Sequence, residues 1–306
     1  MLVSSEVVAT RYRALREAAP DLAVVTSLDE VEPAHIDALF AFKLPAGIAS
    51  RLPNLKLVAS VGAGVDGLLA AGDIPPGAWI TRVVEPTLGL SMAQYVSYQV
   101  LRRLRTFDVY EAQARDRLWQ RHPIADARTH TVGIMGLGEI GGVVAQALLA
   151  LGFRVTGWSR SGRGVAGMHA TYAGDTGLDA FLAETDTLVC LLPFTDATRG
   201  LLDGALLRRL KPGAFVVNAA RGGIVDESAL LALLDAGHLS GAALDVFATE
   251  PLPPEHPLWR HPRVTVTPHV AAQPSVQGAV AQFLANLQRV RSGAAPLHAI
   301  DRQAGY

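Results

Sequence analysis

The stretch TVGIMGLGEIGGVVAQALLALGFRVTGW, residues 131–158, decides the fold. It opens with an apolar run that predicts a strand and continues through Gly136, Gly138 and Gly141 into an apolar helix that ends near Leu151. A second apolar run then predicts another strand. The order of strand, G-x-G-x-x-G turn, helix and strand is typical of a dinucleotide-binding unit.

Each glycine of this turn has a different predicted role. Gly136 permits the tight turn, Gly138 lets a pyrophosphate approach the backbone, and Gly141 lets the helix pack closely on the strand. The backbone amides of Gly138, Glu139 and Ile140 lie at the helix start, where we expect them to face the pyrophosphate. The alternative is a glycine turn that serves packing alone.

The second strand ends without the acidic residue that usually binds the adenosine ribose. It ends with Ser159 and Arg160, and Arg163 follows closely. A hydroxyl and two guanidinium groups suit a 2′-phosphate, which a carboxylate would repel. Hydrogen bonds to a charged group contribute about 1.5–3 kcal/mol each, which predicts a roughly ten- to hundredfold preference for NADPH over NADH. The alternative is that these arginines are solvated loop charges.

Composition limits the class of protein. The chain has 306 residues, of which 50% are hydrophobic and 18% charged, so two domains with sizeable cores are expected. The balance of 27 basic and 28 acidic residues argues against a nucleic-acid partner. No apolar stretch is long enough to span a bilayer and the N-terminus lacks the pattern of a signal peptide, so we expect a cytoplasmic protein with no membrane partner.

Cysteine and metal-ligand patterns add two expectations. Cys190 is the one cysteine, so no internal disulfide is possible, and its apolar surroundings favour a buried structural thiol. No run of His, Cys or carboxylate residues has metal-ligand spacing, so no metal is predicted.

Strand-like and helix-like segments alternate along the chain. Apolar runs at 187–192, 214–218, 241–244 and 264–267 alternate with helical stretches, which predicts a parallel, doubly wound sheet. The N-terminal third alternates in the same way, with a strand-like run at 21–25. Residues 90–110 predict one long helix, and the stretch after Pro274 predicts a final helix.

Three polar residues follow strand-like runs in the second half. Arg221 lies in VVNAARGGIVDE, Glu250 in ALDVFATEPLP and His269 in VTVTPHVAAQ. Ligands of a doubly wound sheet bind at the carboxyl ends of its strands. Taken singly, the three could be a surface charge, a loop carboxylate and a turn residue. His256 and His261 lie in a proline-rich loop and are not expected to take part.

Together with the glycine turn, these segments resemble the D-isomer-specific 2-hydroxyacid dehydrogenase family. The similar stretches are GLGEIG (136–141), LLPFTDATRGL (191–201), NAARGGIVDE (218–227), LDVFATEPLP (244–253) and TPHVAA (267–272). SVGAGVD (60–66) resembles the substrate loop of that family. Within the family, LGLSMAQY (88–95) and GWSRSGR (157–163) are most similar to the glyoxylate/hydroxypyruvate reductase A type.

The resemblance implies an α/β protein with two doubly wound parallel-sheet domains. A flavodoxin-like substrate domain would comprise residues 1–98 and 275–306, and a Rossmann NAD(P)-binding domain would comprise residues 99–274. The active site would lie in the cleft between them. Family members are usually homodimers, and Trp119 would lie either at that interface or in an ordinary core.

The resemblance also implies roles for individual residues. His269 would be the general acid, Glu250 would orient its imidazole, and Arg221 would hold the carboxylate and carbonyl of a 2-oxo acid. Substrate binding would also involve Val61, Gly62, Ala63 and Gly64. Cofactor binding would involve Gly136, Leu137, Gly138, Glu139, Ile140, Gly141, Ser159, Arg160, Arg163, Leu192, Pro193, Ala219, Ala220, Arg221, Asp245 and His269.

The expected function is therefore NADPH-dependent reduction of a small 2-oxo acid such as glyoxylate or hydroxypyruvate. Two alternatives remain at this point. One is an NAD-dependent dehydrogenase of another 2-hydroxy acid, for example 3-phosphoglycerate. The other is a nucleotide-sensing, corepressor-like protein without enzymatic activity, because such proteins share the fold and similar catalytic residues.

Overall fold

A computed structural model describes residues 6–306, and the chain divides into two compact units. One comprises Met1–Leu88 and Gln273–Tyr306, and the other comprises Gly89–Ala272. The first division falls inside helix α3 (Pro86–Leu104), and the expected boundary at residue 98 lies further along the same helix. A continuous helix carries no break in its sequence pattern, so the pattern does not mark this division.

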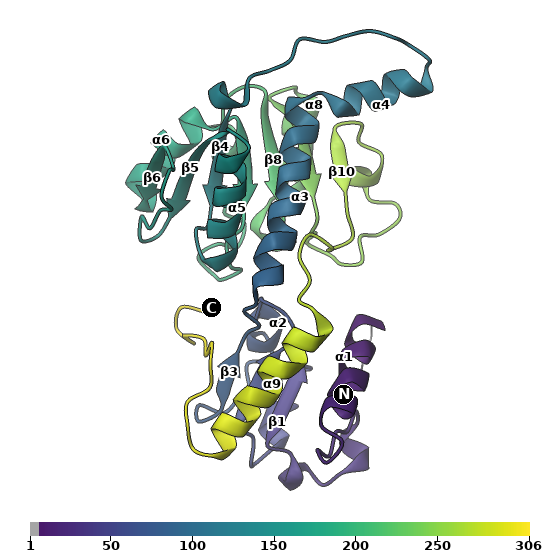
Figure 1. Ribbon diagram of the computed structural model, residues 1–306, viewed down its shortest axis with the longest axis vertical. Helices are drawn as coiled ribbons and strands as arrows, with labels where there is room; N and C mark the ends of the chain where they lie inside the picture. The colour runs from purple at the N-terminus through teal and green to yellow at the C-terminus, as the bar shows by residue number, and fades with distance from the viewer. Residues whose placement is uncertain (1–5) are drawn as a thin grey trace. The chain divides into compact units, whose positions relative to one another are not determined.

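The larger unit is built on a seven-stranded parallel sheet (Figure 1). Its strands are β4 (Thr131–Met135), β5 (Arg154–Ser159), β6 (Ala170–Ala173), β7 (Thr187–Cys190), β8 (Ala214–Asn218), β9 (Leu239–Leu244) and β10 (Val264–Val266). Their order is β10-β9-β8-β7-β4-β5-β6. The chain therefore enters at β4, builds outward to β6, and returns to build the other half from β7. This confirms the expected α/β class with parallel strands, while β6 was not predicted.

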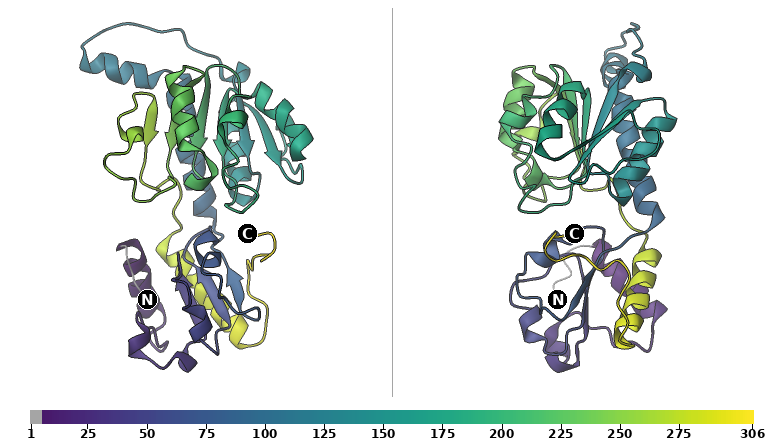
Figure 2. Two further views of the ribbon diagram at one scale, coloured as in Figure 1. Left: turned by 180° about the vertical axis from the view of Figure 1, so that it is seen from behind. Right: turned by 90° about the vertical axis from the view of Figure 1, so that its left-hand side faces the viewer.

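Both faces of this sheet are covered by helices. Along β4, Val132 and Ile134 face one apolar core and Met135 faces the other. Figures 1 and 2 show α3 and α5 (Glu139–Ala150) on one face and α8 (Glu227–Asp235) on the other. The second face is completed by α6 (Gly174–Glu184) and the short α7 (Gly204–Leu207). Burial on both faces explains why the strands are apolar runs rather than alternating ones.

Two sequence expectations about local structure are wrong. Residues 90–110 form two helices, because α3 ends at Leu104 and α4 (Phe107–Arg115) begins after Thr106, whose φ of 52° is left-handed. Residues 21–25 form no strand. In both places the composition is compatible with the expected element, and tertiary packing decides the outcome. In Figures 1 and 2, α4 and the irregular segment after it project from the larger unit.

The smaller unit contains a three-stranded parallel sheet in the order β1-β2-β3. Its strands are β1 (Ala38–Ala41), β2 (Leu57–Ser60) and β3 (Trp79–Thr81), and its helices are α1 (Glu6–Ala18), α2 (Asp66–Leu69) and α9 (Val276–Arg291). Phe40 joins the sheet to α1 and α9. The Tyr12 hydroxyl donates to the Phe40 carbonyl at 2.6 Å, and the rings of Phe40 and Phe283 stack with centroids 4.7 Å apart.

The remaining helical segments are single 3₁₀ turns at the ends of loops. They are η1 (Leu28–Glu30), η2 (Pro33–His35), η3 (Ala49–Arg51), η4 (Ala127–Thr129), η5 (Gly222–Ile224) and η6 (Pro257–Trp259). Within residues 6–306, no helix combines the length and the apolar character needed to cross a bilayer.

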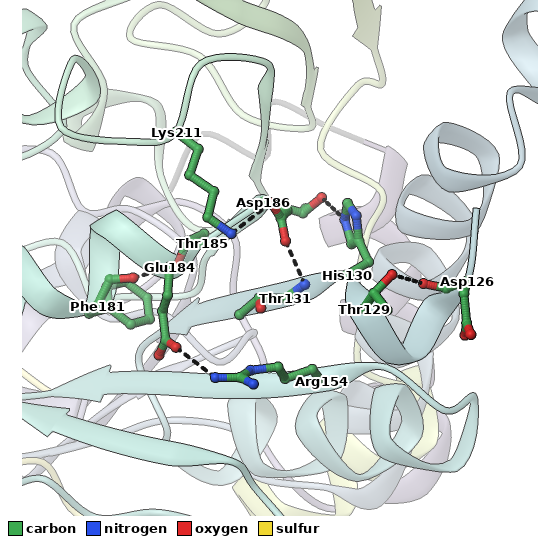
Figure 3. Close-up of polar contacts among 11 residues, drawn as sticks. Asp126, Thr129, His130, Thr131, Arg154, Phe181, Glu184, Thr185, Asp186 and Lys211 are labelled. Atoms are coloured by element: carbon green, nitrogen blue, oxygen red, sulfur yellow. Dashed lines mark hydrogen bonds and ion pairs between the residues drawn. The ribbon is translucent and has the colours of Figure 1, made fainter.

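A polar network ties together the amino ends of the central strands (Figure 3). The carboxylate of Asp186 accepts hydrogen bonds from the backbone N–H of Thr131 at 2.8 Å and from Lys211 Nζ at 2.9 Å. His130 Nε2 lies 2.9 Å from the hydroxyl of Thr187, and burial lowers the pKa of its imidazole. These groups satisfy one another at the starts of β4, β7 and β8. These contacts account for the polar residues at this edge of the sheet, which lies opposite the edge formed by the carboxyl ends of the strands.

Candidate active site at the carboxyl edge of the large sheet

The glycine turn joins β4 to α5 at the carboxyl edge of the sheet. Gly136 has a φ of +100°, and a Cβ there would lie 2.7 Å from the Leu191 carbonyl oxygen. A Cβ on Gly141 would overlap the Gly136 carbonyl oxygen. At Gly138, the residue that precedes α5, no atom lies within 4 Å of the Cβ position. Backbone atoms therefore fill the space beside Gly136 and Gly141, whereas the space beside Gly138, at the N-terminus of α5, is open. This arrangement fits a dinucleotide pyrophosphate.

Ser159 ends β5, the neighbouring strand, with Arg160 and Arg163 exposed on the turn that follows. The Ser159 hydroxyl oxygen is buried and has no hydrogen-bond partner among the described residues. Buried polar atoms almost always have a partner. A phosphate group at this tip would supply the missing acceptor, so the residues present fit a 2′-phosphorylated dinucleotide.

Leu192 and Pro193 follow β7 at the same edge. The Thr198 hydroxyl donates to the Pro193 carbonyl at 2.7 Å and accepts from the Thr195 N–H at 2.8 Å. This turn holds the chain just beyond the strand. Thr195 and Thr198 were not expected as site residues from the sequence, and their role is visible only in the folded turn.

Arg221 follows β8, beyond Ala219 and Ala220. Asn218, the last residue of β8, accepts from the Ala220 N–H at 3.2 Å and donates its side-chain amide to the Arg221 carbonyl at 3.1 Å. Arg221 Nη1 donates to the Ala220 carbonyl at 2.7 Å. Asn218 is buried and fixes the backbone that presents Arg221, although the sequence pattern did not single it out.

Glu250 and His269 form a close pair. His269 Nδ1 lies 2.8 Å from Glu250 Oε2, and the Phe247 N–H donates to Glu250 Oε1 at 3.0 Å. Burial alone raises the pKa of Glu250, but the hydrogen bonds from His269 and Phe247 and the charges of His269 and Arg221 outweigh it. The net pKa of Glu250 lies below its usual value. The carboxylate is therefore ionised beside the imidazole at neutral pH.

The backbone at His269 is left-handed, with a φ of 56°. Its N–H donates to the Asp245 carbonyl at 2.8 Å. A non-glycine residue in this conformation costs on the order of 1 kcal/mol and persists where the surroundings enforce it. The strained backbone conformation therefore belongs to His269, the residue whose ring contacts Glu250.

Asp245 supplies that enforcement. Its buried carboxylate accepts hydrogen bonds from the Thr267 hydroxyl at 2.6 Å, the Val270 N–H at 2.9 Å and the Ala271 N–H at 2.8 Å. The sequence led us to expect Asp245 beside the nicotinamide, and the structure assigns its carboxylate oxygens to the loop that carries His269. The loop is thus clamped on both sides of the histidine.

Tyr95 extends this network from α3. Its hydroxyl lies 2.9 Å from the Thr267 hydroxyl oxygen. Since the Thr267 proton is directed to Asp245, the Tyr95 hydroxyl is the donor to Thr267. Burial, chiefly, raises the pKa of Tyr95 to about 12, so it remains a donor at neutral pH.

The residues expected to bind substrate through their amides, Val61 to Gly64, belong to the smaller unit and follow β2. The Ser60 hydroxyl donates to the Gly64 carbonyl at 2.7 Å and accepts from the Gly62 N–H at 3.1 Å. The Gly62 amide is thus already used within the loop. Ser60 was not expected as a site residue, and it shapes the turn.

The larger unit therefore brings Arg221, Glu250 and His269 to the edge that also carries the glycine turn and Ser159. All of them follow parallel strands, and the carboxyl ends of parallel strands share one edge. Across residues 6–306, no group of three His, Cys, Asp or Glu side chains is arranged to hold a metal ion.

Comparison with known proteins agrees with this architecture. Residues 98–271 match the family described as D-isomer specific 2-hydroxyacid dehydrogenase, NAD binding domain. A glyoxylate/hydroxypyruvate reductase A from Yersinia enterocolitica is 40% identical over 264 residues, covering 85% of this chain and 84% of that protein. The Salmonella paratyphi B protein of the same name is 42% identical over 258 residues, covering 83% and 82%.

Two solved structures are similar over nearly the whole chain. One is a D-isomer specific 2-hydroxyacid dehydrogenase from Xanthobacter autotrophicus in complex with NADPH and MES. It has a TM-score of 0.92 and 37% identity, covering 100% of this chain and 98% of that one. The other is an NADPH-dependent glyoxylate/hydroxypyruvate reductase from Sinorhizobium meliloti in complex with NADP and sulfate. It has a TM-score of 0.91 and 39% identity, covering 97% and 96%.

The family suggested by the sequence motifs is confirmed by these matches, and the family model spans the glycine turn and the segments of Arg221, Glu250 and His269. The chain belongs to the D-isomer specific 2-hydroxyacid dehydrogenase family.

Proposed function

We propose that this protein reduces small 2-oxo acids, with glyoxylate and hydroxypyruvate as substrates, and uses NADPH as the reductant. The observation that carries the proposal is the 2.8 Å pair of His269 and Glu250 on the sheet edge that also presents Arg221. At this edge His269 can donate a proton, Glu250 can stabilise the charged imidazole, and Arg221 can bind the substrate anion. Relatives named glyoxylate/hydroxypyruvate reductase A support the substrate class.

His269 acts as the general acid. An ionised carboxylate can only accept hydrogen bonds, so Nδ1 of His269 carries the proton that faces Glu250. In the imidazolium form the second proton is on Nε2, and this is the proton given to the carbonyl oxygen of the substrate. Glu250 stabilises the imidazolium and holds the ring in one orientation.

Arg221 binds the substrate anion and polarises its carbonyl group. A guanidinium presents donors in a planar fork that matches a carboxylate, and its charge stabilises the oxyanion that develops during reduction.

The dinucleotide is held by the glycine turn and by the tip of β5. The amides of Gly138, Glu139 and Ile140 bind the pyrophosphate, and Ser159, Arg160 and Arg163 bind the 2′-phosphate. When bound, the cofactor supplies the hydride that reduces the carbonyl carbon. Leu137, Leu192, Pro193, Ala219 and Ala220 line the remainder of its site.

A panel of 2-oxo acids tests the proposal. NADPH oxidation would be followed at 340 nm with glyoxylate, hydroxypyruvate, pyruvate and phenylpyruvate. We expect the highest kcat/KM with one of the first two. Turnover of 3-phosphoglycerate with NAD would favour the alternative dehydrogenase, and inactivity across the panel with intact NADPH binding would favour a sensing protein.

The first prediction concerns cofactor choice. Removing both guanidinium groups in an Arg160→Ala, Arg163→Ala double variant should reduce the NADPH preference in kcat/KM by about ten- to hundredfold, because one or two charge-assisted hydrogen bonds are lost. The measurement is kcat/KM with NADPH and with NADH. Arg208→Ala, at the residue that follows α7, is the matched control for loss of an exposed arginine. An unchanged ratio in the double variant would remove these arginines from the 2′-phosphate site.

The second prediction concerns pH. Glu250→Gln keeps the side-chain shape but removes the negative charge beside His269. Since an ionised Glu250 favours the imidazolium, its loss should make reductive activity fail at lower pH than in the parent. The readout is the alkaline limb of the kcat/KM profile. If that limb stays in place, Glu250 does not sustain the protonated state of His269.

We also propose that the protein is a homodimer. Leu118, Trp119 and Ile124 are 52%, 92% and 75% exposed in the projecting segment after α4, so Trp119 is not a core residue. Apolar side chains gathered at such a surface typically mark a protein–protein contact. Sedimentation should give twice the 32.4 kDa chain mass, and Trp119→Ser should lower the measured mass toward that of one chain.

A cytoplasmic location follows from the proposed reaction, since NADPH is produced and used inside the cell.

A further inference from the structure

The peptide that joins Phe247 and Ala248 lies in the loop after β9, between two contacts with carboxylates. On one side, the Phe247 N–H donates to Glu250 Oε1 at 3.0 Å, and Glu250 Oε2 contacts His269. On the other side, the Ala248 N–H donates to Glu227 Oε1 at 2.7 Å. Two carboxylates therefore hold neighbouring amides of one loop, and the proposed mechanism uses only Glu250.

The same peptide also contacts the segment that carries Arg221. A Cβ on Gly222 would overlap the Phe247 carbonyl group and the Ala248 nitrogen. The backbone after Arg221 thus packs directly on the Phe247–Ala248 peptide, with no space between them. A displacement of this peptide would move Glu250 relative to both Arg221 and His269.

Glu227 is itself held by a histidine. It is the first residue of α8, its side chain is 15% exposed, and its Oε2 lies 3.5 Å from His256 Nε2. The Leu258 N–H donates to His256 Nδ1 at 3.4 Å. Because Nδ1 accepts, the proton of the neutral ring is on Nε2, the nitrogen that faces Glu227 at 3.5 Å. His256 therefore orients one carboxylate oxygen and leaves the other for Ala248.

We propose that Glu227 and His256 are positioning residues for the catalytic pair: His256 orients Glu227, Glu227 fixes the Ala248 amide, and the fixed loop places Glu250 against His269. The inference rests on the proposed function of that pair. Neither residue touches the reacting atoms. From the sequence, His256 in its proline-rich loop was not expected to take part, and its contact with Glu227 changes that interpretation.

A second pair on α8 provides an internal comparison. His261 Nε2 lies 3.4 Å from Asp235 Oδ1, and the Arg263 N–H donates to His261 Nδ1 at 3.2 Å. The ring contacts repeat those of His256, but Asp235 is the last residue of α8, away from the loop of Glu250. If His256 only stabilises the loop in which it lies, the two histidines should behave alike when substituted.

The experiment uses substitutions that separate the two ring nitrogens of each histidine. His256→Gln retains a donor at the Nε2 position, whereas His256→Asn retains only the acceptor at the Nδ1 position. We expect His256→Asn and Glu227→Ala to lower kcat by about tenfold or more while KM for NADPH stays within about twofold, since small displacements of catalytic groups are costly. His256→Gln should recover most of the activity, because its amide keeps a donor for Glu227.

His261→Asn is the matched control and should leave kcat unchanged. Equal losses in His256→Asn and His261→Asn, or no recovery in His256→Gln, would overturn the proposal. If Glu227→Ala does not fold, the two His256 variants and His261→Asn still decide the outcome.

A readout independent of turnover separates this proposal from the proposed function. In protein labelled with ¹⁵N-histidine, the Nδ1–H resonance of His269 reports its hydrogen bond to Glu250, and His269→Asn assigns the signal. We expect this resonance to shift in His256→Asn and to stay in His261→Asn, whether or not the protein reduces any acid of the panel. An inactive parent with that shift would overturn the function alone. An active parent whose resonance is unchanged in His256→Asn would overturn the positioning role alone.

Discussion

His269→Asn should lower kcat for 2-oxo acid reduction by about 10²–10⁴-fold while leaving NADPH affinity unchanged. A general acid contributes a factor of this size, and asparagine offers no proton to the developing alkoxide at neutral pH. Asparagine tolerates the left-handed backbone at this position, where φ is 56°, better than most residues. Its amide also retains an N–H donor for Glu250, so the loop should keep its conformation.

Stopped-flow and steady-state kinetics with saturating NADPH would measure this loss, and fluorescence titration would measure cofactor affinity. His298→Asn is the matched control, because His298 also has a left-handed backbone, with a φ of 55°, and lies in the smaller unit. It should leave kcat unchanged. Retention of more than about a tenth of the parent kcat in His269→Asn would rule out His269 as the proton donor.

Arg221→Ala should reduce kcat/KM for 2-oxo acids by about 10²–10³-fold, again with NADPH affinity preserved. The variant removes the charge that anchors the substrate carboxylate and stabilises the oxyanion, and a donor to a developing oxyanion has an effect of this size. Arg221→Lys should recover only part of the loss, since an ammonium group cannot form the planar, two-point contact.

The split between KM and kcat sharpens the test of Arg221. An anchor used equally in the ground state and the transition state would raise KM alone, whereas polarisation of the carbonyl lowers kcat as well. We expect both changes. A neutral 2-oxo compound, such as a 2-oxo ester, should lose less activity in Arg221→Ala than glyoxylate does. An equal loss for both would show that Arg221 does not recognise the carboxylate.

Secondary structure could be predicted well where local patterning and packing agree. The glycine turn, β8 and α9 lie where the sequence predicted them, because apolar runs and glycines with defined steric roles indicate them directly. The break at Thr106 could not be predicted, since no glycine or proline marks it. β6 was missed because it is an edge strand with half-exposed residues and lacks the apolar run of its neighbours.

The contacts that support the catalytic residues were harder to predict than the catalytic residues themselves. Arg221, Glu250 and His269 each follow a strand-like run, and their motifs identify the family. Asn218 and Ser60 act through hydrogen bonds to backbone groups, and Thr267 acts through the side chains of Asp245 and Tyr95. Neither kind of contact has a sequence signature. Their roles became visible only when the partner atoms were in place.

The sequence by itself determined the α/β class, the dinucleotide-binding turn, the family and the choice of side chains proposed to react. These properties depend on local sterics, periodicity and residue chemistry, which are written in consecutive residues. Only the tertiary structure decided that Asp245 clamps the His269 loop and that Glu227 and His256 hold the Glu250 loop. Each of these contacts joins residues about twenty or more positions apart, and their distance and direction are set by the packing of strands and helices between them.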